Sequence, residues 1–143
     1  MLKDMLVRDW MTRNIVSVAS DTPITTTHAV MKDNNIRRLP VIDRGKLVGI
    51  ITIGDIREAS PSTATTLNIW ELNYLWSQIL VKEVMSKEVL TVSADEPMIN
   101  AANMMLTQKV SGLPVLDKNR KVIGIVTESD IFRMVVKSQA EDI

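Results

Sequence analysis

The sequence contains one stretch twice: RRLPVIDRGKLVGIITIGDI at residues 37–56 and SGLPVLDKNRKVIGIVTESDI at residues 111–131. In each copy a short apolar run containing Pro is followed by a polar turn. A longer continuous apolar run comes next, as is typical of a strand covered on both faces. That run ends at Thr-x-x-Asp, where a helix is expected to begin. Each copy therefore predicts a β-hairpin followed by a helix.

The segments before each copy also correspond. Apolar strands are predicted over 15–18 and 89–92. A helix follows each strand, with Pro23 or Pro97 expected at its first position after a capping residue. The copies lie 74 positions apart up to Asp43 and Asp117, and 75 positions apart after the turn. The sequence therefore predicts an α/β (α+β) fold of two β-α-β-β-α repeats, packed sheet-to-sheet with pseudo-two-fold symmetry.

The predicted domains are repeat 1 over 1–60, a linker with an aromatic helix over 61–78, and repeat 2 over 79–143. A loop is expected over 59–64, and a helix from Leu67 to Leu80, which carries Trp70, Tyr74 and Trp76. These aromatic side chains either cover one end of the core or form a dimer contact. The predicted core consists of Val16, Val18, Met31, Leu39, Val41, Val48, Ile50, Leu90, Val92, Met105, Leu113, Val115, Ile123 and Ile125.

Composition excludes several classes of protein. The 143 residues carry 17 basic and 17 acidic groups, which disfavours a general nucleic-acid binder. There is no cysteine, so no disulfide, thiol nucleophile or thiolate metal site is available. No apolar run approaches the roughly 20 residues of a membrane helix, and the N-terminus lacks a signal-peptide pattern. These features predict a cytoplasmic protein without a membrane segment.

With these motifs in this order, the chain resembles a tandem pair of CBS domains, often called a Bateman module. The aromatic linker and the Ala-Ser-Pro-Ser after the first copy are similar to small stand-alone bacterial members, including the acetoin-utilisation type. The resemblance implies a regulatory module rather than an enzyme. It implies clefts between the repeats that bind adenine nucleotides or related ligands, and flat, disc-shaped homodimers.

The resemblance also implies two cross-built sites. One would combine Thr127 and Asp130 with Ser17, Thr22, Thr27, Ile36, Arg37 and Arg38. The other would combine Thr52 and Asp55 with Thr91, Ala101, Val110, Ser111 and Gly112. Each Asp would accept hydrogen bonds from a ribose diol, while Arg37 and Arg38 would reach phosphates. Only the Asp130 site gains the two arginines, so the nucleotide is expected to prefer it.

Each motif also has a purely structural interpretation. Thr-x-x-Asp is nearly a capping box and stabilises a helix start without any ligand. Arg37 and Arg38 could be a solvated surface pair. His28, the only histidine, lies on an apolar helix face and is predicted to be a part-buried packing residue, and the methionines are predicted to fill the core. No second histidine or carboxylate cluster completes a metal set, and no nucleophile–base pair indicates catalysis.

Two functions therefore remain open. The first is a non-catalytic sensor of AMP, ADP, ATP or S-adenosylmethionine that requires no cofactor. The second is a structural dimerisation module whose clefts bind nothing. In either case a homodimer is expected, with the helices after Thr52 and Thr127 and the segment Trp70–Trp76 as candidate contacts.

Overall fold

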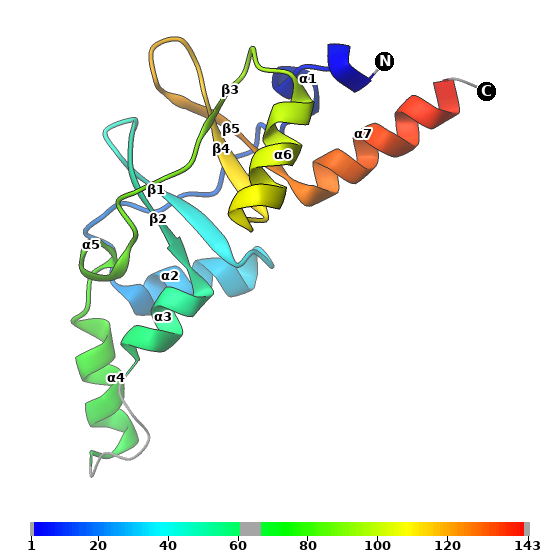
Figure 1. The fold of residues 1–143 in the computed structure, drawn as a ribbon. Coiled ribbons are helices and arrows are strands. Elements are labelled where there is room, and N and C mark those ends of the chain that lie inside the picture. Colours follow the sequence, from blue (N-terminus) through cyan, green and yellow to red (C-terminus); the bar gives the residue numbers. More distant parts are fainter. Residues whose placement is uncertain (1, 61–66, 142–143) are drawn as a thin grey trace. The chain divides into compact units, whose positions relative to one another are not determined.

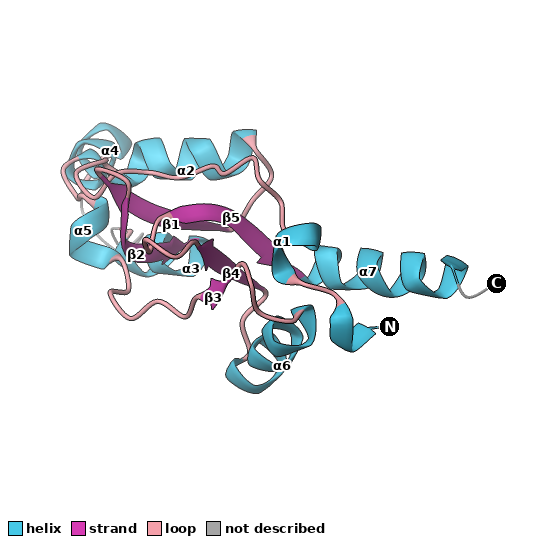
Figure 2. Ribbon diagram, turned by 90° about the horizontal axis from the view of Figure 1, so that it is seen from above, coloured by secondary structure: helices cyan, strands magenta, loops and turns pink. Residues whose placement is uncertain are grey.

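The computed structural model describes residues 2–60 and 67–141. These residues form two compact units, one of residues 16–89 and one of residues 1–15 with 90–143. Figure 1 shows the fold, and Figure 2 shows its helices and strands from a second direction. The first six residues of the predicted linker, 61–66, lie outside the described residues, as does most of the predicted loop.

In the unit of residues 16–89, the strands β1 (Arg38–Asp43) and β2 (Lys46–Thr52) form an antiparallel hairpin. The turn consists of Arg44 and Gly45, both at positive φ, which is the geometry of a tight hairpin with the twist of its strands. The helices of this unit are α2 (Ile24–Asp33), α3 (Ile53–Ala59), α4 (Ile69–Ser77) and α5 (Val81–Val84).

In the other unit, β3 (Val92–Ser93) pairs in parallel with β4 (Gly112–Leu116), which pairs with the antiparallel β5 (Val122–Thr127). Between Asp117 and Lys121 the second hairpin has one residue more than the first has between Asp43 and Lys46, and Arg120 lies there at a φ of 66°. The helical elements are η1 (Leu2–Asp4), α1 (Val7–Trp10), α6 (Met98–Gln108) and α7 (Glu128–Glu141). Two repeats, each with a small sheet and helices, confirm the predicted fold class.

The short segments 7–12 and 81–86, here called the first and second lead-in, each bond to the repeat that follows the other one. Backbone bonds join Val7 to Glu96 (2.9 Å), while Thr12 and Ile125 exchange two bonds of 2.8 and 2.9 Å. In the same way the second lead-in joins the first repeat, because Ile50 and Ser86 exchange two bonds of 2.9 Å. The predicted division into 1–60, 61–78 and 79–143 follows the sequence repeats and stays a prediction, whereas the compact units exchange these short segments.

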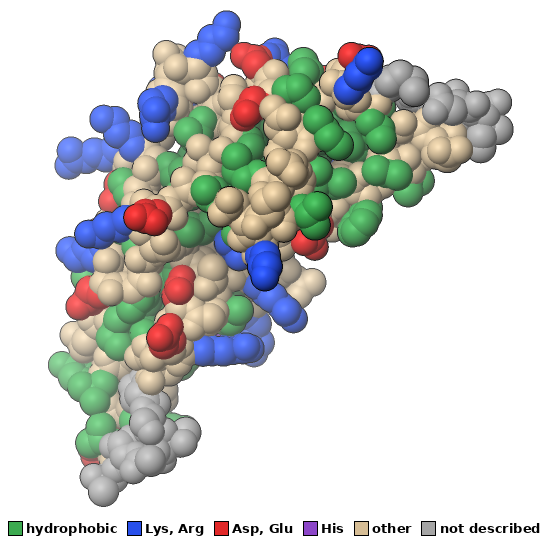
Figure 3. Space-filling model, in the orientation of Figure 1, with side chains coloured by type: hydrophobic (Ala, Val, Ile, Leu, Met, Phe, Trp, Pro, Cys, Tyr) green, Lys and Arg blue, Asp and Glu red, His purple; other side chains and the backbone are tan. Residues whose placement is uncertain are grey.

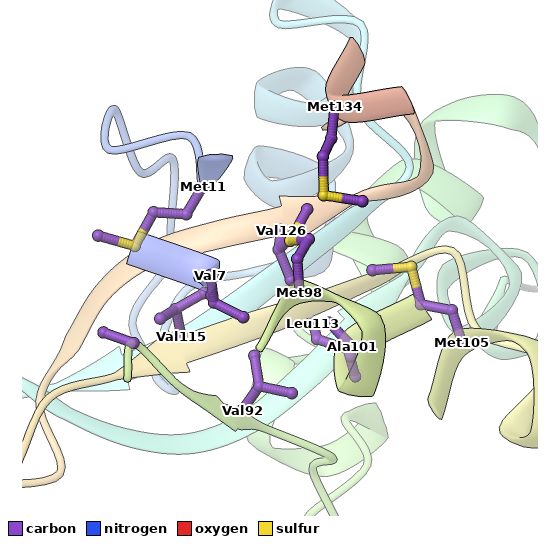
Figure 4. Close-up of a cluster of buried hydrophobic side chains, with 11 residues drawn as sticks. Val7, Met11, Val92, Met98, Ala101, Met105, Leu113, Val115, Val126 and Met134 are labelled. Atoms are coloured by element: carbon purple, nitrogen blue, oxygen red, sulfur yellow. The ribbon is translucent and has the colours of Figure 1, made fainter. Parts of the chain in front are cut away.

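The hydrophobic cores lie between the sheets and helices of each unit. Figure 4 shows the core of the second unit, where Met98 of α6 and Met134 of α7 lie with Val126 of β5 and Val7 of α1. The predicted core residues that are buried are Val18, Met31, Leu39, Val41, Val92, Met105, Leu113 and Val115. Val16, Val48 and Ile123 pack against these cores, and Ile50 and Ile125 are half-buried.

Three local predictions were wrong. Leu90 is 40% exposed, because β3 begins only at Val92 and leaves Leu90 outside the ladder. The predicted strand over 15–18 is reduced to a single bridge between Val18 and Val41. Pro23 and Pro97 are the N-cap residues themselves rather than the first helical residues, and neither cap carries a side-chain bond.

The side chains of the aromatic helix α4 are divided between the core and the surface, and its role as a dimer contact stays a prediction. Trp76 packs against the core beside His28, with ring centroids 5.9 Å apart, and His28 is half-buried as predicted. In contrast, Trp70 is 79% exposed and Tyr74 is 64% exposed. Leu67, Trp70, Glu71, Tyr74 and Leu75 line a shallow hollow along this exposed face.

Candidate functional site

Thr52 and Asp55 form a complete capping box at the start of α3. The Thr52 hydroxyl accepts the Asp55 backbone N–H at 3.1 Å, and Asp55 Oδ2 accepts the Thr52 N–H at 2.9 Å. Asp55 is half-buried, and among the described residues no donor is bonded to its Oδ1. The structural interpretation of Thr-x-x-Asp therefore holds here, and it leaves one carboxylate oxygen available.

Thr127 and Asp130 start α7 with a different arrangement. Asp130 Oδ2 accepts both the Thr127 N–H at 2.9 Å and the Thr127 hydroxyl at 3.2 Å. Its Oδ1 accepts the Thr12 hydroxyl at 3.3 Å and forms an ion pair with Arg133 Nη2 at 2.9 Å. Three hydrogen bonds and one ion pair therefore engage both oxygens of Asp130, which is only 2% exposed.

The two repeats differ at the positions that contact Asp130. Glu58 occupies the position of Arg133 and carries the opposite charge. Ser86 occupies the position of Thr12, but its hydroxyl donates to the Glu88 carbonyl rather than to Asp55. Neither Thr12 nor Arg133 was predicted as a site residue from the sequence. The spacing of Asp130 and Arg133 could have indicated their ion pair, because side chains three residues apart are neighbours on a helix surface.

The residues before each Leu-Pro-Val run lie beside the Thr-x-x-Asp motif of their own repeat. Arg38 is the register partner of Thr52, and Gly112 is the register partner of Thr127. The Arg37 carbonyl accepts the Ile53 N–H at 2.9 Å. The Ser111 carbonyl accepts the Glu128 N–H in the same way, at 3.1 Å. Both helix starts are therefore held by the residues that precede the hairpin.

The other predicted site residues fall into two groups. Thr27 and Ala101 are fully buried, and the Thr27 hydroxyl donates to the Pro23 carbonyl within α2. Exposed or half-buried positions are taken by Ser17, Thr22, Ile36, Arg37, Arg38, Thr91, Val110 and Ser111. Each predicted site draws on residues of both compact units, so the composition of both sites stays a prediction.

Asp43, at the end of β1, has an environment that favours its charged form. The Ser20 hydroxyl donates to Asp43 Oδ2 at 2.5 Å and the Ser20 N–H donates to Oδ1 at 2.9 Å. These two bonds lower the pKa of Asp43 below its ordinary value of 3.8. The pair ties the segment after Val18 to the hairpin and is a structural contact.

Over residues 2–60 and 67–141, no group of three or more His, Asp or Glu side chains could hold a metal ion. None of the described helices is long and apolar enough to cross a membrane.

The model of the CBS domain matches residues 7–62 and 81–137. The chain belongs to the CBS-domain family. It is 34% identical to a CBS domain-containing protein of Dictyostelium discoideum over 93% of this chain and 92% of that protein. Several other relatives are longer and carry enzyme names. Among them is L-aspartate semialdehyde sulfurtransferase of Methanocaldococcus jannaschii. The match is 35% identical and covers 90% of this chain but only 23% of that protein.

Solved CBS pairs have the same fold. The CBS pair of protein MJ0100, in complex with 5′-methylthioadenosine and S-adenosyl-L-methionine, is 33% identical with a TM-score of 0.74, over 94% of this chain and 98% of that one. CBSX2 of Arabidopsis thaliana in complex with AMP is 28% identical with a TM-score of 0.78, over 94% and 98%. An acetoin utilization protein (AcuB) of Vibrio cholerae is 26% identical with a TM-score of 0.79, over 95% and 93%, and agrees with the resemblance inferred from the sequence.

Proposed function

We propose that this CBS pair is a non-catalytic regulatory module that binds an adenine nucleotide or a related adenosyl ligand at one or both Thr-x-x-Asp helix starts. The observation that carries the proposal is the Asp55 motif. Its capping Thr begins a helix whose positive end favours a phosphate, and its Asp keeps one oxygen for a ribose hydroxyl. The ligands of the MJ0100 pair and of CBSX2, which all contain adenosine, support this ligand class.

The choice among AMP, ADP, ATP and S-adenosylmethionine stays open in this proposal. The predicted preference for the Asp130 site rests on the two arginines, Arg37 and Arg38. No cofactor is required by the proposal, and a cytoplasmic location stays a prediction.

Calorimetric titration of the four ligands and 5′-methylthioadenosine into the wild-type chain tests the proposal. Asp55→Ala and Asp130→Ala are titrated alongside, with Asp117→Ala in the β4–β5 turn as the control for losing one carboxylate. We expect at least one ligand to bind, and at least one motif variant to remove a site that Asp117→Ala retains. Heat changes equal to dilution for all five ligands would refute nucleotide binding.

The alternative, a structural dimerisation module, is favoured by exposed apolar side chains on the helices. On α7, Phe132 is 68% exposed and Val136 is 67% exposed, and on α6, Leu106 is 79% exposed. Figure 3 shows hydrophobic side chains gathered over α6 and α7. We propose a homodimer that uses α7, because exposed apolar patches mark interaction sites and the cores of homodimer interfaces are more apolar than the rest of the surface. Light scattering of the wild-type chain and Phe132→Glu tests it: a monomeric wild-type chain over a wide concentration range would refute the dimer.

A further inference from the structure

Arg133 connects the Asp130 carboxylate to the N-terminal segment. Its Nη2 forms the ion pair with Asp130 Oδ1 at 2.9 Å and donates to the Trp10 carbonyl at 2.8 Å. Its guanidinium carbon also lies 6.0 Å from the centre of the Trp10 ring, and Lys137 Nζ lies 5.9 Å from it. The Trp10 carbonyl is at the C-terminal end of α1, where backbone acceptors lack partners within the helix. Arg133 therefore holds α1 against α7.

The same contact occupies the group that a ribose would need. A ribose diol requires two acceptor positions on the carboxylate. Both oxygens of Asp130 are already engaged, Oδ2 by two hydrogen bonds from Thr127 and Oδ1 by the Thr12 hydroxyl and the Arg133 ion pair. The Thr127 N–H belongs to the helix start and cannot leave without breaking it. The Thr12 bond is long at 3.3 Å, and the Arg133 side chain is 46% exposed, so water readily replaces Asp130 as its partner.

We propose that Arg133 controls access to Asp130. In the unliganded chain it occupies Oδ1, and the ribose hydroxyls of a bound adenosyl ligand replace both Arg133 and Thr12. Release of Arg133 also removes its bond to the Trp10 carbonyl, so occupancy of the site loosens α1. The inference rests on the proposed function for its ligand, but the contact between Arg133 and α1 exists without any ligand.

The Asp55 motif of the other repeat has no arginine in the position of Arg133. Glu58 stands where Arg133 would be, and Asp55 Oδ1 has no donor among the described residues. One motif is therefore open in the unliganded chain and the other is occupied from within. The two sites are expected to respond differently to the same ligand, and only the Asp130 site is expected to couple ligand binding to the N-terminal segment.

Adenosine is the probe that isolates this effect, because it has the diol but no phosphate that Arg133 could attract. The measurement is calorimetric titration of Asp55→Ala, in which only the Asp130 site remains, and of the same chain with Arg133→Met added. Removal of the competitor is expected to tighten adenosine binding about three- to fivefold, as fits a partly exposed ion pair. With Arg133→Lys, the affinity for adenosine is expected to be closer to that of the chain that retains Arg133. Lys118→Met controls for the loss of one exposed positive charge.

A merely structural Arg133 gives the opposite sign, since its loss would weaken the site. Unchanged or weaker adenosine binding in the Arg133→Met chain therefore overturns the proposal. Hydrogen exchange gives a second readout in the wild-type chain and in Arg133→Met alone. The amides of residues 8–12 should exchange faster in Arg133→Met without ligand, and adenosine should accelerate them only when Arg133 is present.

The two proposals fail in different ways. If no adenosyl ligand binds any variant, the proposed function is refuted, along with the competition at Asp130. Faster exchange of α1 in Arg133→Met would then still establish the contact that holds α1. If ligands bind and α1 exchanges equally in wild type and Arg133→Met, the control by Arg133 is refuted and the proposed function stands.

Discussion

The Met85 side chain fills the space beside Gly49. A Cβ added to Gly49 would lie 2.5 Å from Met85 Sδ and 2.9 Å from the Ser86 carbonyl oxygen. The same relationship joins Gly124 to Met11, where the Cβ would lie 2.6 Å from the sulfur and 3.0 Å from the Thr12 carbonyl oxygen. Each lead-in segment therefore crosses the middle of the neighbouring strand, at a position that only glycine leaves open.

Gly49→Ala and Gly124→Ala should each lower the free energy of unfolding by about 1–3 kcal/mol, because the added methyl group must displace both a sulfur and a backbone oxygen. Urea denaturation measures the change. The matched control is Gly54→Ala in α3, where the nearest atom to an added Cβ is 3.6 Å away. That variant should be neutral or stabilising by up to about 1 kcal/mol, since Ala favours helix over Gly. Tolerance of Ala at both strand positions would contradict the packing described.

The two aspartates of the Thr-x-x-Asp motifs should contribute unequally to stability. Asp130→Ala removes a buried acceptor from the Thr127 N–H and from Arg133, and should cost about 1–3 kcal/mol. Asp55→Ala removes one bond from a half-buried capping box and should cost about 1 kcal/mol or less. Urea denaturation of both variants without ligand measures the difference. Asp130→Asn, which keeps the acceptor for the Thr127 N–H, should fall between wild type and Asp130→Ala, and a larger loss from Asp55→Ala would contradict this ranking.

The Ser20–Asp43 pair should make stability depend on pH in the acid range. Because the bonds from Ser20 lower the pKa of Asp43 in the folded state, this contribution is fully present above pH 3.8 and is lost as the pH falls through the folded-state pKa. Ser20→Ala should therefore be less stable than wild type near neutral pH, and the difference should shrink below about pH 4. Denaturation at several pH values measures it, with the exposed Ser111→Ala as control. A difference that is constant with pH would show that the bond does not act through ionisation.

Much of the fold could be predicted because local sequence signals mark where the turns, strands and helices of each repeat begin and end. The Arg44-Gly45 turn, the apolar strands and the capping Thr52 each have local signals, and each was placed correctly. The exchange of lead-in segments could not be predicted, because it depends on which of two nearly equivalent repeats a short helix packs against. The prediction that Leu90 is buried was wrong for a related reason. An apolar residue in a strand-like run does not show where the hydrogen-bonded ladder begins.

The candidate site shows the same division between local and long-range information. The capping geometry of Thr52 and Asp55 follows from their spacing alone. The bond from Thr12 to Asp130 spans 118 positions, and no periodicity indicates it. The resemblance predicted Thr27 as a ligand contact, which stays a prediction; in the structure its hydroxyl donates to the Pro23 carbonyl.

Arg38 should distinguish ligands by their phosphates. Arg38→Ala should weaken ATP binding about three- to tenfold and leave adenosine unchanged, because a half-buried guanidinium contributes only a partly screened, charge-assisted bond to a phosphate. Lys32→Ala, which removes an exposed charge from α2, is the control and should change neither ligand. The site that Arg38 serves is then found by repeating the titrations with Asp55→Ala or Asp130→Ala present. The predicted cross-repeat site requires the Arg38 effect to persist with Asp55→Ala and to vanish with Asp130→Ala. The reverse result would assign Arg38 to Thr52, its register partner in the same repeat, and would overturn the predicted pairing with Asp130.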